Sequence, residues 1–271
     1  MVHRIAAPVL ATVMLTSAWF AFAQQHTAIP PDLKFEVASL KPSPPDGGGR
    51  PGGIRPAAGG QRYEATNCPL KLMIQVAYRV KGEQIVGGPG WIDSQLFDMQ
   101  GIAARPSNGD ELHVMLMNLL VERCHLQFHK DKKEMAMYAL TVDKGGPHMT
   151  PHEAANSRDT WIDQTLNNIV QMKLKATSTP MDYFAFRLST LMDRPVVNLT
   201  NLPGDYDFNL EYTADLPPGL SENTKLNGEP IDTSGPNVFA AVKQQLGLNL
   251  KTQRGPVDII VIDRIEKPVE N

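Results

Sequence analysis

Three polar side chains, Asp205, Asp207 and Asn209, alternate along one short segment in the spacing that opens a calcium-binding loop. Such a loop also needs glycine at its sixth position, for a sharp turn, and a bidentate glutamate at its twelfth. Those positions hold Leu210 and Leu216. Because polar and apolar residues alternate here as on a β-strand, we interpret the polar side chains as the solvent side of a strand.

Histidines occur twice in spacings that resemble a zinc site. The segment from His152 and Glu153 to Asn156 approaches H-E-x-x-H, in which two imidazoles one helical turn apart hold the metal. Its second imidazole is replaced by the Asn156 amide. His125 and His129 lie four residues apart in an expected strand, and the sequence places no third ligand nearby. We therefore predict no metal site and no cofactor.

The chain lacks the patterns of a nucleophilic enzyme. There is no G-x-S-x-G elbow, and the Gly-rich run at 47–53 lacks the lysine and hydroxyl of a phosphate-binding loop. Paired carboxylates for glycoside hydrolysis remain an alternative, with Asp93 and Asp98 as candidate acids. We predict no catalytic residue and favour a non-enzyme.

The most distinctive local segment is a Gly- and Pro-rich turn that carries a tryptophan. Its candidate binding residues are Gly88, Pro89, Gly90, Trp91 and Asp93. A tryptophan exposed beside such a turn can stack on a ligand or a partner. The alternative is that Trp91 packs over the end of a helix.

These residues belong to a chain whose second half repeats its first. Residues 65–70, Ala-Thr-Asn-Cys-Pro-Leu, return as 176–181, Ala-Thr-Ser-Thr-Pro-Met. Residues 97–100, Phe-Asp-Met-Gln, return as 208–211, Phe-Asn-Leu-Glu, and both pairs are 111 residues apart. A constant offset indicates a tandem duplication, so we expect any specific function where the copies differ.

Each copy has the patterns of two amphipathic helices and several strands. The apolar positions of the first helix follow the spacing of one buried face; they are Leu70, Met73, Ile74, Ala77 and Tyr78. We predict an α+β fold, a tandem duplication of a small mixed-sheet unit with two amphipathic helices packed on the sheet.

A hairpin is expected to close each unit. In the first copy, residues 125–130 would pair with 135–142, and the Lys-Asp-Lys-Lys segment 130–133 would form the solvated turn. In the second copy, 248–252 would pair with 257–262. The offset has become 122 here, which places an insertion at 213–235 that is expected to be a surface loop.

The N-terminus has the pattern of an export signal. Arg4 is followed by an apolar stretch and by Ala-Phe-Ala at 21–23, an A-x-A cleavage pattern. A membrane anchor is the alternative, but the small-residue cleavage site favours removal. We predict a signal peptide at 1–23, export to the periplasm or the medium, and no stable membrane insertion after cleavage.

The rest of the chain divides into four parts. We predict an N-terminal strand with a Pro/Gly-rich loop at 24–61, the first α+β repeat at 62–144, a linker at 145–171 and the second repeat at 172–271. The formal net charge of −3 gives no electrostatic basis for binding nucleic acid.

Two cysteines would enter an oxidising compartment after export. Cys68 and Cys124 either form a disulfide or serve as small buried hydrophobes. Their counterparts in the second copy are Thr179 and Leu246, so a disulfide would be an addition to one copy. This difference favours packing over pairing.

Several segments, in order, resemble a known family. They are 35–39, Phe-Glu-Val-Ala-Ser; 87–93, Gly-Gly-Pro-Gly-Trp-Ile-Asp; 138–140 with 144–147; 204–208, Gly-Asp-Tyr-Asp-Phe; and 261–268, Val-Ile-Asp-Arg-Ile-Glu-Lys-Pro. The chain resembles the soil-associated exported bacterial proteins, a family defined by a domain of unknown function. This resemblance implies export but no activity.

Each half is also similar to the short N-terminal domain of secretins and TonB-dependent receptors, in its Pro-Leu helix start, Gly-bearing turn, Leu-rich helix and closing hairpin. That likeness implies a small periplasmic interaction module.

Together these observations predict a non-catalytic binding or interaction module of the cell envelope, with an unknown protein or envelope component as partner. The alternative is a secreted hydrolase of a cell-wall or plant-derived polymer.

Overall fold

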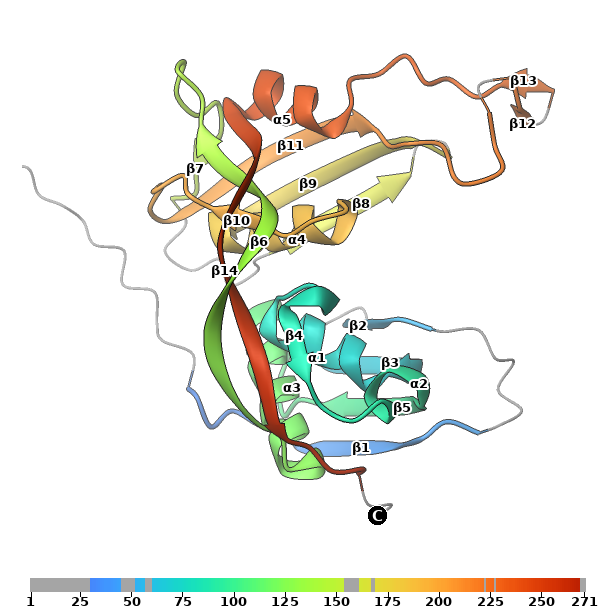
Figure 1. Ribbon diagram of the computed structural model, residues 1–271, viewed down its shortest axis with the longest axis vertical. Helices are drawn as coiled ribbons and strands as arrows, with labels where there is room; N and C mark the ends of the chain where they lie inside the picture. The colour runs from blue at the N-terminus through green and yellow to red at the C-terminus, as the bar shows by residue number, and fades with distance from the viewer. Residues whose placement is uncertain are drawn as a thin grey trace, which may run out of the picture.

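The computed structural model describes residues 30–44, 52–56, 60–153, 161–166, 169–221, 223–226 and 228–268. They form two lobes, one above the other in Figure 1, joined by a ribbon of two long strands. The predicted signal peptide, residues 1–23, and part of the Pro/Gly-rich loop lie outside the described residues. Within the described chain, no helix is both long and apolar enough to cross a bilayer.

The first lobe is a four-stranded sheet with helices packed on it. In spatial order its strands are β1 (Val37–Pro42), β5 (Leu96–Ile102), β3 (Arg62–Pro69) and β2 (Ile54–Pro56). The helices α1 (Leu70–Tyr78) and α3 (Gly109–Cys124) share one apolar core with this sheet. A 3-10 turn (Gly82–Gln84) and the short helix α2 (Trp91–Ser94) complete the lobe.

The second lobe repeats this arrangement. Its sheet has the order β7 (Thr150–Pro151), β11 (Asp205–Thr213), β9 (Gln171–Pro180) and β8 (Trp161–Leu166). Its helices are α4 (Met181–Leu191) and α5 (Val238–Leu246). The α+β fold predicted from the sequence is therefore confirmed. The segment predicted as a linker supplies β7 and β8, which correspond to β1 and β2 of the first lobe.

The short pair β12 (Lys225–Leu226) and β13 (Glu229–Pro230) lies within the predicted insertion. It extends from the second lobe as a loop in Figure 1.

The ribbon consists of β6 (Gln127–Val142) and β14 (Leu248–Arg264), which pair antiparallel along their length. The short strand β4 (Ile85–Gly87) runs parallel to β14, and β10 (Val196–Asn198) runs parallel to β6. The predicted hairpins are therefore wrong. The segment 130–133 lies inside β6, because it has no turn-forming glycine or proline and β14 supplies a continuous partner.

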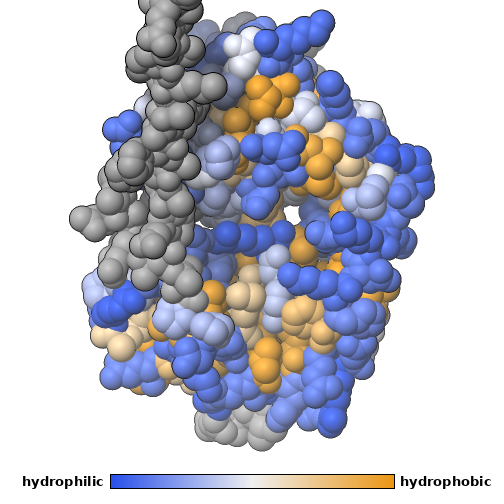
Figure 2. All heavy atoms as spheres, turned by 90° about the vertical axis from the view of Figure 1, so that its left-hand side faces the viewer, coloured by the Kyte–Doolittle hydropathy of each residue, from blue (hydrophilic) through white to orange (hydrophobic). Residues whose placement is uncertain are grey.

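The ribbon exchanges strands between the two lobes. Phe128 pairs with Ile262, and Leu140 pairs with Leu250. With the offset of 122 residues, Phe128 corresponds to Leu250 and Leu140 to Ile262, so both lobes contain the same pairing. Each lobe thus receives one strand segment from each half of the sequence. Figure 2, which faces the ribbon, shows hydrophilic side chains crossing the waist between the lobes.

The same β-bulge occurs in both sheets. Its central residue adopts a left-handed conformation, with φ of 48° at Asn67 and 46° at Ser178. After the bulge, Ala65 pairs with Met99, whereas Ala176 pairs with Phe208. Met99 and Phe208 are 109 residues apart, so the alignment of this strand at 111 is wrong by two residues. The turn that carries α2 makes the first copy longer before β5.

The two cysteines lie in the core of the first lobe. Cys68 and Cys124 are fully buried free thiols. Burial raises the pKa of each thiol to about 12. At neutral pH both therefore remain protonated and pack as apolar side chains.

Candidate functional site

The tryptophan turn is built from two glycines with left-handed backbone. Gly87 and Gly88 have φ of 79° and 81°, where a side chain would be strained. Trp91 is half-buried against the core, with its ring 6.1 Å from the Phe97 ring, and the Lys267 ammonium lies 5.8 Å from its centre. Trp91 thus packs against Phe97 of β5 while part of its ring remains at the surface.

The remaining candidate residues of this turn lie at the surface. Gly88, Pro89, Gly90 and Asp93 are exposed. The Asp93 carboxylate accepts a hydrogen bond from Lys71 Nζ at 3.2 Å. The turn therefore presents backbone and one paired acid to solvent.

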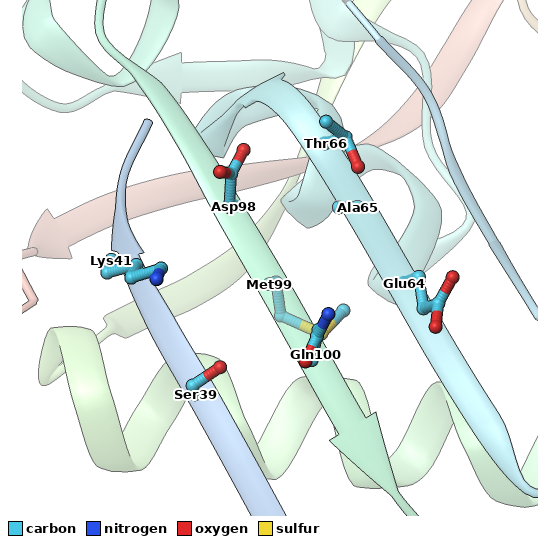
Figure 3. A pocket seen from close by; sticks show the side chains of 8 residues that line it. All are labelled: Ser39, Lys41, Glu64, Ala65, Thr66, Asp98, Met99 and Gln100. Carbon is cyan, nitrogen blue, oxygen red and sulfur yellow. The ribbon is translucent and has the colours of Figure 1, made fainter. Parts of the chain in front are cut away.

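A shallow hollow lies on the face of the first sheet opposite the helices (Figure 3). Asp98 and Gln100 lie on the central strand, between Lys41 on β1 and Glu64 on β3. The hollow has a volume of about 190 Å³, less than the usual size of a ligand pocket. Asp98 Oδ1 already accepts hydrogen bonds from the Ser43 hydroxyl at 2.7 Å and the Asn67 amide at 2.9 Å.

A larger groove lies between the two lobes. It has a volume of about 530 Å³, which is in the range of sites for small organic ligands. The first lobe contributes residues of β2, β3, the end of α1 and the start of α3. The second lobe contributes residues of β8 and α4. This groove is the strongest candidate site, because neither lobe forms it alone.

The two copies differ where they face the groove. At the offset of 111, Val76 of α1 corresponds to Arg187 of α4, and Arg79 at the end of α1 corresponds to Thr190. The arginine therefore occupies a different position in the two copies. Helix α3 begins at Gly109, whereas α5 begins at a position equivalent to residue 116 of the first copy. The extra turns of α3 bring Asp110 and His113 into the groove.

Arg79 links the two sides of the groove. It ends α1 in a left-handed conformation with φ of 55°. Its guanidinium forms an ion pair with Asp110, lies 3.2 Å from His113 Nδ1, and stacks 4.6 Å from the ring centre of Tyr183 on α4. Lys81 Nζ, two residues further along the chain, donates a hydrogen bond to the Met192 carbonyl oxygen. These contacts join the lobes outside the ribbon.

His113 is neutral in this setting. Burial, and then the positive charge of Arg79, lower the pKa of His113 to about 4. The charge of Asp110 and a hydrogen bond to the Gly109 backbone raise this pKa, but by less. Because a guanidinium only donates, we assign His113 Nδ1 as the acceptor of the Arg79 contact. The groove therefore has one fixed cation at this point rather than two.

Two tyrosines line the same groove. Burial raises the pKa of both Tyr63 and Tyr183. The positive charges of Arg187 and Arg79 lower the pKa of Tyr183, but by less than burial raises it. Neither hydroxyl donates a hydrogen bond to another residue that the structure describes. Both are therefore protonated hydrogen-bond donors available to a ligand.

Comparison with known proteins supplies a family for this chain. Residues 71–265, more than half of the chain, match the family described as a protein of unknown function, DUF3738. The chain belongs to the DUF3738 family. The matched range covers nearly all of α1, together with α3, the ribbon and the second lobe, whereas the groove residues of β2 and β3 precede it. Neither the curated proteins nor the solved structures gave a match.

The other candidates from the sequence lie apart from the groove. His129 Nδ1 lies 2.9 Å from Asp263 Oδ1, at an exposed position on the ribbon. His125, which was expected in a strand, is instead the C-cap residue of α3, and its Nδ1 lies 3.4 Å from Glu266 Oε2. Asp207 lies on the outer face of the second sheet, as expected for a solvent-facing strand residue. Across the described ranges, no group of three or more His, Cys, Asp or Glu is placed to hold a metal.

Sequence reasoning did not single out the groove residues Arg79, His113 or Tyr183. One signal was available for His113. The apolar spacing of α3 extends upstream to Leu112 and Met115, beyond the segment that the second copy matches. Arg79 and Tyr183 carry no comparable mark.

Proposed function

We propose that this DUF3738 chain is an exported, non-catalytic binding module of the cell envelope whose ligand occupies the groove between the lobes. The observation that carries the proposal is the groove itself, with donors from both lobes facing one cavity of about 530 Å³. Export and the soil association rest on the sequence pattern alone. The partner class remains an envelope component or a protein.

The arrangement of the lobes supports binding between them. Outside the ribbon they meet at small contacts such as Arg79 with Tyr183 and Lys81 with Met192. A ligand in the groove would contact both lobes and so add to these contacts. The likeness of each half to a periplasmic interaction module agrees with this role.

The hydrolase alternative has less support. Its candidate acids do not converge on a common cleft, because Asp93 lies on the exposed turn with Lys71, whereas Asp98 holds the bulge of the first sheet. Within the groove, Asp110 is paired with Arg79. A pair of free carboxylates flanking a substrate bond is therefore not evident among the described residues.

The test is to fill the groove and to ask whether binding is lost. Thr190 is an exposed residue of α4 that lines the groove, so Thr190→Trp would occupy the cavity with little effect on the core. The mature chain, Thr190→Trp and the turn variant Trp91→Ala would each be immobilised and exposed to cell-envelope extract. The bound material would be identified by mass spectrometry.

We expect Thr190→Trp to lose the bound component and Trp91→Ala to retain it. The reverse pattern would place binding at the tryptophan turn and refute the groove. Circular dichroism and thermal unfolding of each variant would establish that both remain folded.

A further inference from the structure

We infer that the groove binds a small amphiphilic monocarboxylate, with the carboxylate at Arg187 and the apolar body between α1 and α4. This inference rests on the proposed function and specifies its ligand. It is carried by an unpaired buried donor, by the charge of the lining and by the apolar character of the walls.

The unpaired donor belongs to Arg187 on α4. One terminal nitrogen of its guanidinium donates to Gln164 Oε1 at 3.2 Å. Its Nε atom is buried and has no hydrogen-bond partner among the described residues. Buried donors without partners are rare in folded proteins. A guanidinium presents Nε–H and a terminal N–H as a fork that matches the two oxygens of a carboxylate.

The charge of the groove favours a single negative charge on the ligand. Three arginines line it, Arg55, Arg79 and Arg187, against two acids, Asp110 and Asp163. Arg79 and Asp110 neutralise each other, and Asp163 makes an interaction of its own. One positive charge is thus left in excess. A monoanion balances it, whereas a phosphate monoester would bring about two negative charges.

The additional donors also suit a carboxylate. The hydroxyls of Tyr63 and Tyr183 are protonated and lack acceptors among the described residues. A carboxylate is rich in acceptors, with two oxygens and about four lone-pair sites. A ligand that mainly donates hydrogen bonds, such as an amine, would find few free acceptors here.

The walls of the groove are largely apolar. Side chains from both lobes contribute, and they are Ile54, Val76, Leu112, Ile162 and Phe186. Burying an apolar ligand body against them is favourable in proportion to the area removed from water. A ligand with one charged end and an apolar chain or ring therefore matches the lining better than a sugar does.

The test uses a matched pair of probes, 4-phenylbutyrate and its neutral amide 4-phenylbutyramide. Isothermal titration calorimetry would measure the binding of each to the mature chain, to Arg187→Gln and to Arg187→Lys. Arg194→Gln is the matched control, because Arg194 lies in the same lobe and stacks on Tyr138, outside the groove.

We expect the carboxylate to bind about tenfold more tightly than the amide, as for a hydrogen bond to a charged group. Arg187→Gln should remove that preference, Arg187→Lys should retain part of it because the charge remains, and Arg194→Gln should leave it unchanged. Equal affinity for the two probes, or a preference that survives in Arg187→Gln, would overturn the inference. So would the absence of any binding of 4-phenylbutyrate at millimolar concentration.

The outcome can be separated from that of the proposed function. If Thr190→Trp abolishes capture of an envelope component but neither probe distinguishes the charge, the groove is a binding site of another chemistry. If Thr190→Trp leaves both capture and carboxylate binding intact, the inference and the proposed function fall together.

Discussion

Asp98 and Asp207 hold the same bulge in the two lobes. Asp98 Oδ1 accepts a hydrogen bond from the amide of Asn67 at 2.9 Å, and Asp207 Oδ1 accepts one from the amide of Ser178 at 2.7 Å. Both donors belong to left-handed residues, whose amides point away from the regular strand ladder. An acid repeated in the same structural role in both lobes is explained by the fold and needs no catalytic role.

Removing the charge at Asp207 should weaken this bulge. Burial raises the pKa of Asp207, but hydrogen bonds from His152 and from the Ser178 amide, with the charge of His152, outweigh it and hold the pKa below its usual value. A carboxyl group with a depressed pKa stabilises the folded state at pH values above its unfolded pKa of about 4. This stabilisation is lost as the pH falls through the folded pKa. We expect Asp207→Asn to lose about 1 kcal/mol at pH 7, measured by urea unfolding.

The control is Asp258→Asn, since Asp258 is an exposed acid on the ribbon that lies 3.7 Å from Lys132 Nζ. It should change stability little. The difference between wild type and Asp207→Asn should disappear well below pH 4, where the wild-type carboxylate is also protonated. A difference that persists unchanged at low pH would mean that the charge of Asp207 does not support the bulge.

The sequence predicts the elements better than their connection. The helix that contains Leu70, Met73 and Ile74 was predicted from one buried face, and these residues are buried. The strand containing Phe208 and Leu210 was predicted from alternation, and both are buried while Asn209 is exposed. Periodicity reports local burial, which is why these predictions succeed.

The exchange of strands could not be predicted, for a specific physical reason. In a closed hairpin Phe128 would pair with Leu140, whereas in the ribbon it pairs with Ile262, the counterpart of Leu140. Because the copies have equivalent residues at these positions, the local contacts are nearly the same in both arrangements. The sequence pattern therefore does not distinguish them.

The groove was beyond prediction for a related reason. Arg55, Arg79, His113 and Arg187 come from separate segments, and their proximity depends on how the ribbon places one lobe against the other. No spacing within one segment indicates such a site. The sequence predicts specific function where the copies differ, and the groove lining is one place where they differ.

The cysteines give a direct test of the core of the first lobe. Burial raises the pKa of both Cys68 and Cys124 to about 12, and a buried protonated thiol reacts slowly. We expect the purified mature chain to show no thiol reactive toward a disulfide reagent when native and two when unfolded in guanidinium chloride. Exposed Ser94→Cys, on α2, would serve as a reactive control. A failure to find thiols in the unfolded chain would reveal a disulfide.

His113 should make stability depend on pH in a defined window. Its folded pKa is lowered to about 4, first by burial and then by Arg79, whereas the unfolded value is about 6.5. Between these values the unfolded chain binds a proton that the folded chain does not, so the free energy of unfolding falls as the pH drops from about 6.5 to 4. We expect this loss to be on the order of 2 kcal/mol, measured by urea unfolding.

His113→Gln should remove most of this loss, because glutamine does not titrate. His148→Gln, a change at an exposed loop histidine, is the matched control and should retain it. The same pH dependence in wild type and His113→Gln would show that another group causes it. A nuclear magnetic resonance titration would locate the His113 transition directly.

The ribbon predicts that the two halves of the chain remain together after the link between them is cut. A site-specific protease sequence inserted after the exposed Gly145 would separate β6 from β14 in sequence while leaving their pairing intact. We expect the cut halves to elute as one complex in size-exclusion chromatography, because Leu140 of β6 lies in the core of the second lobe and Ile262 of β14 lies in that of the first. They should separate only in denaturant.

A cut after Gly219, in the insertion of the second lobe, is the control for protease treatment. If the halves cut at Gly145 instead eluted as two folded fragments, each would have closed its own hairpin, and the strand exchange would be refuted.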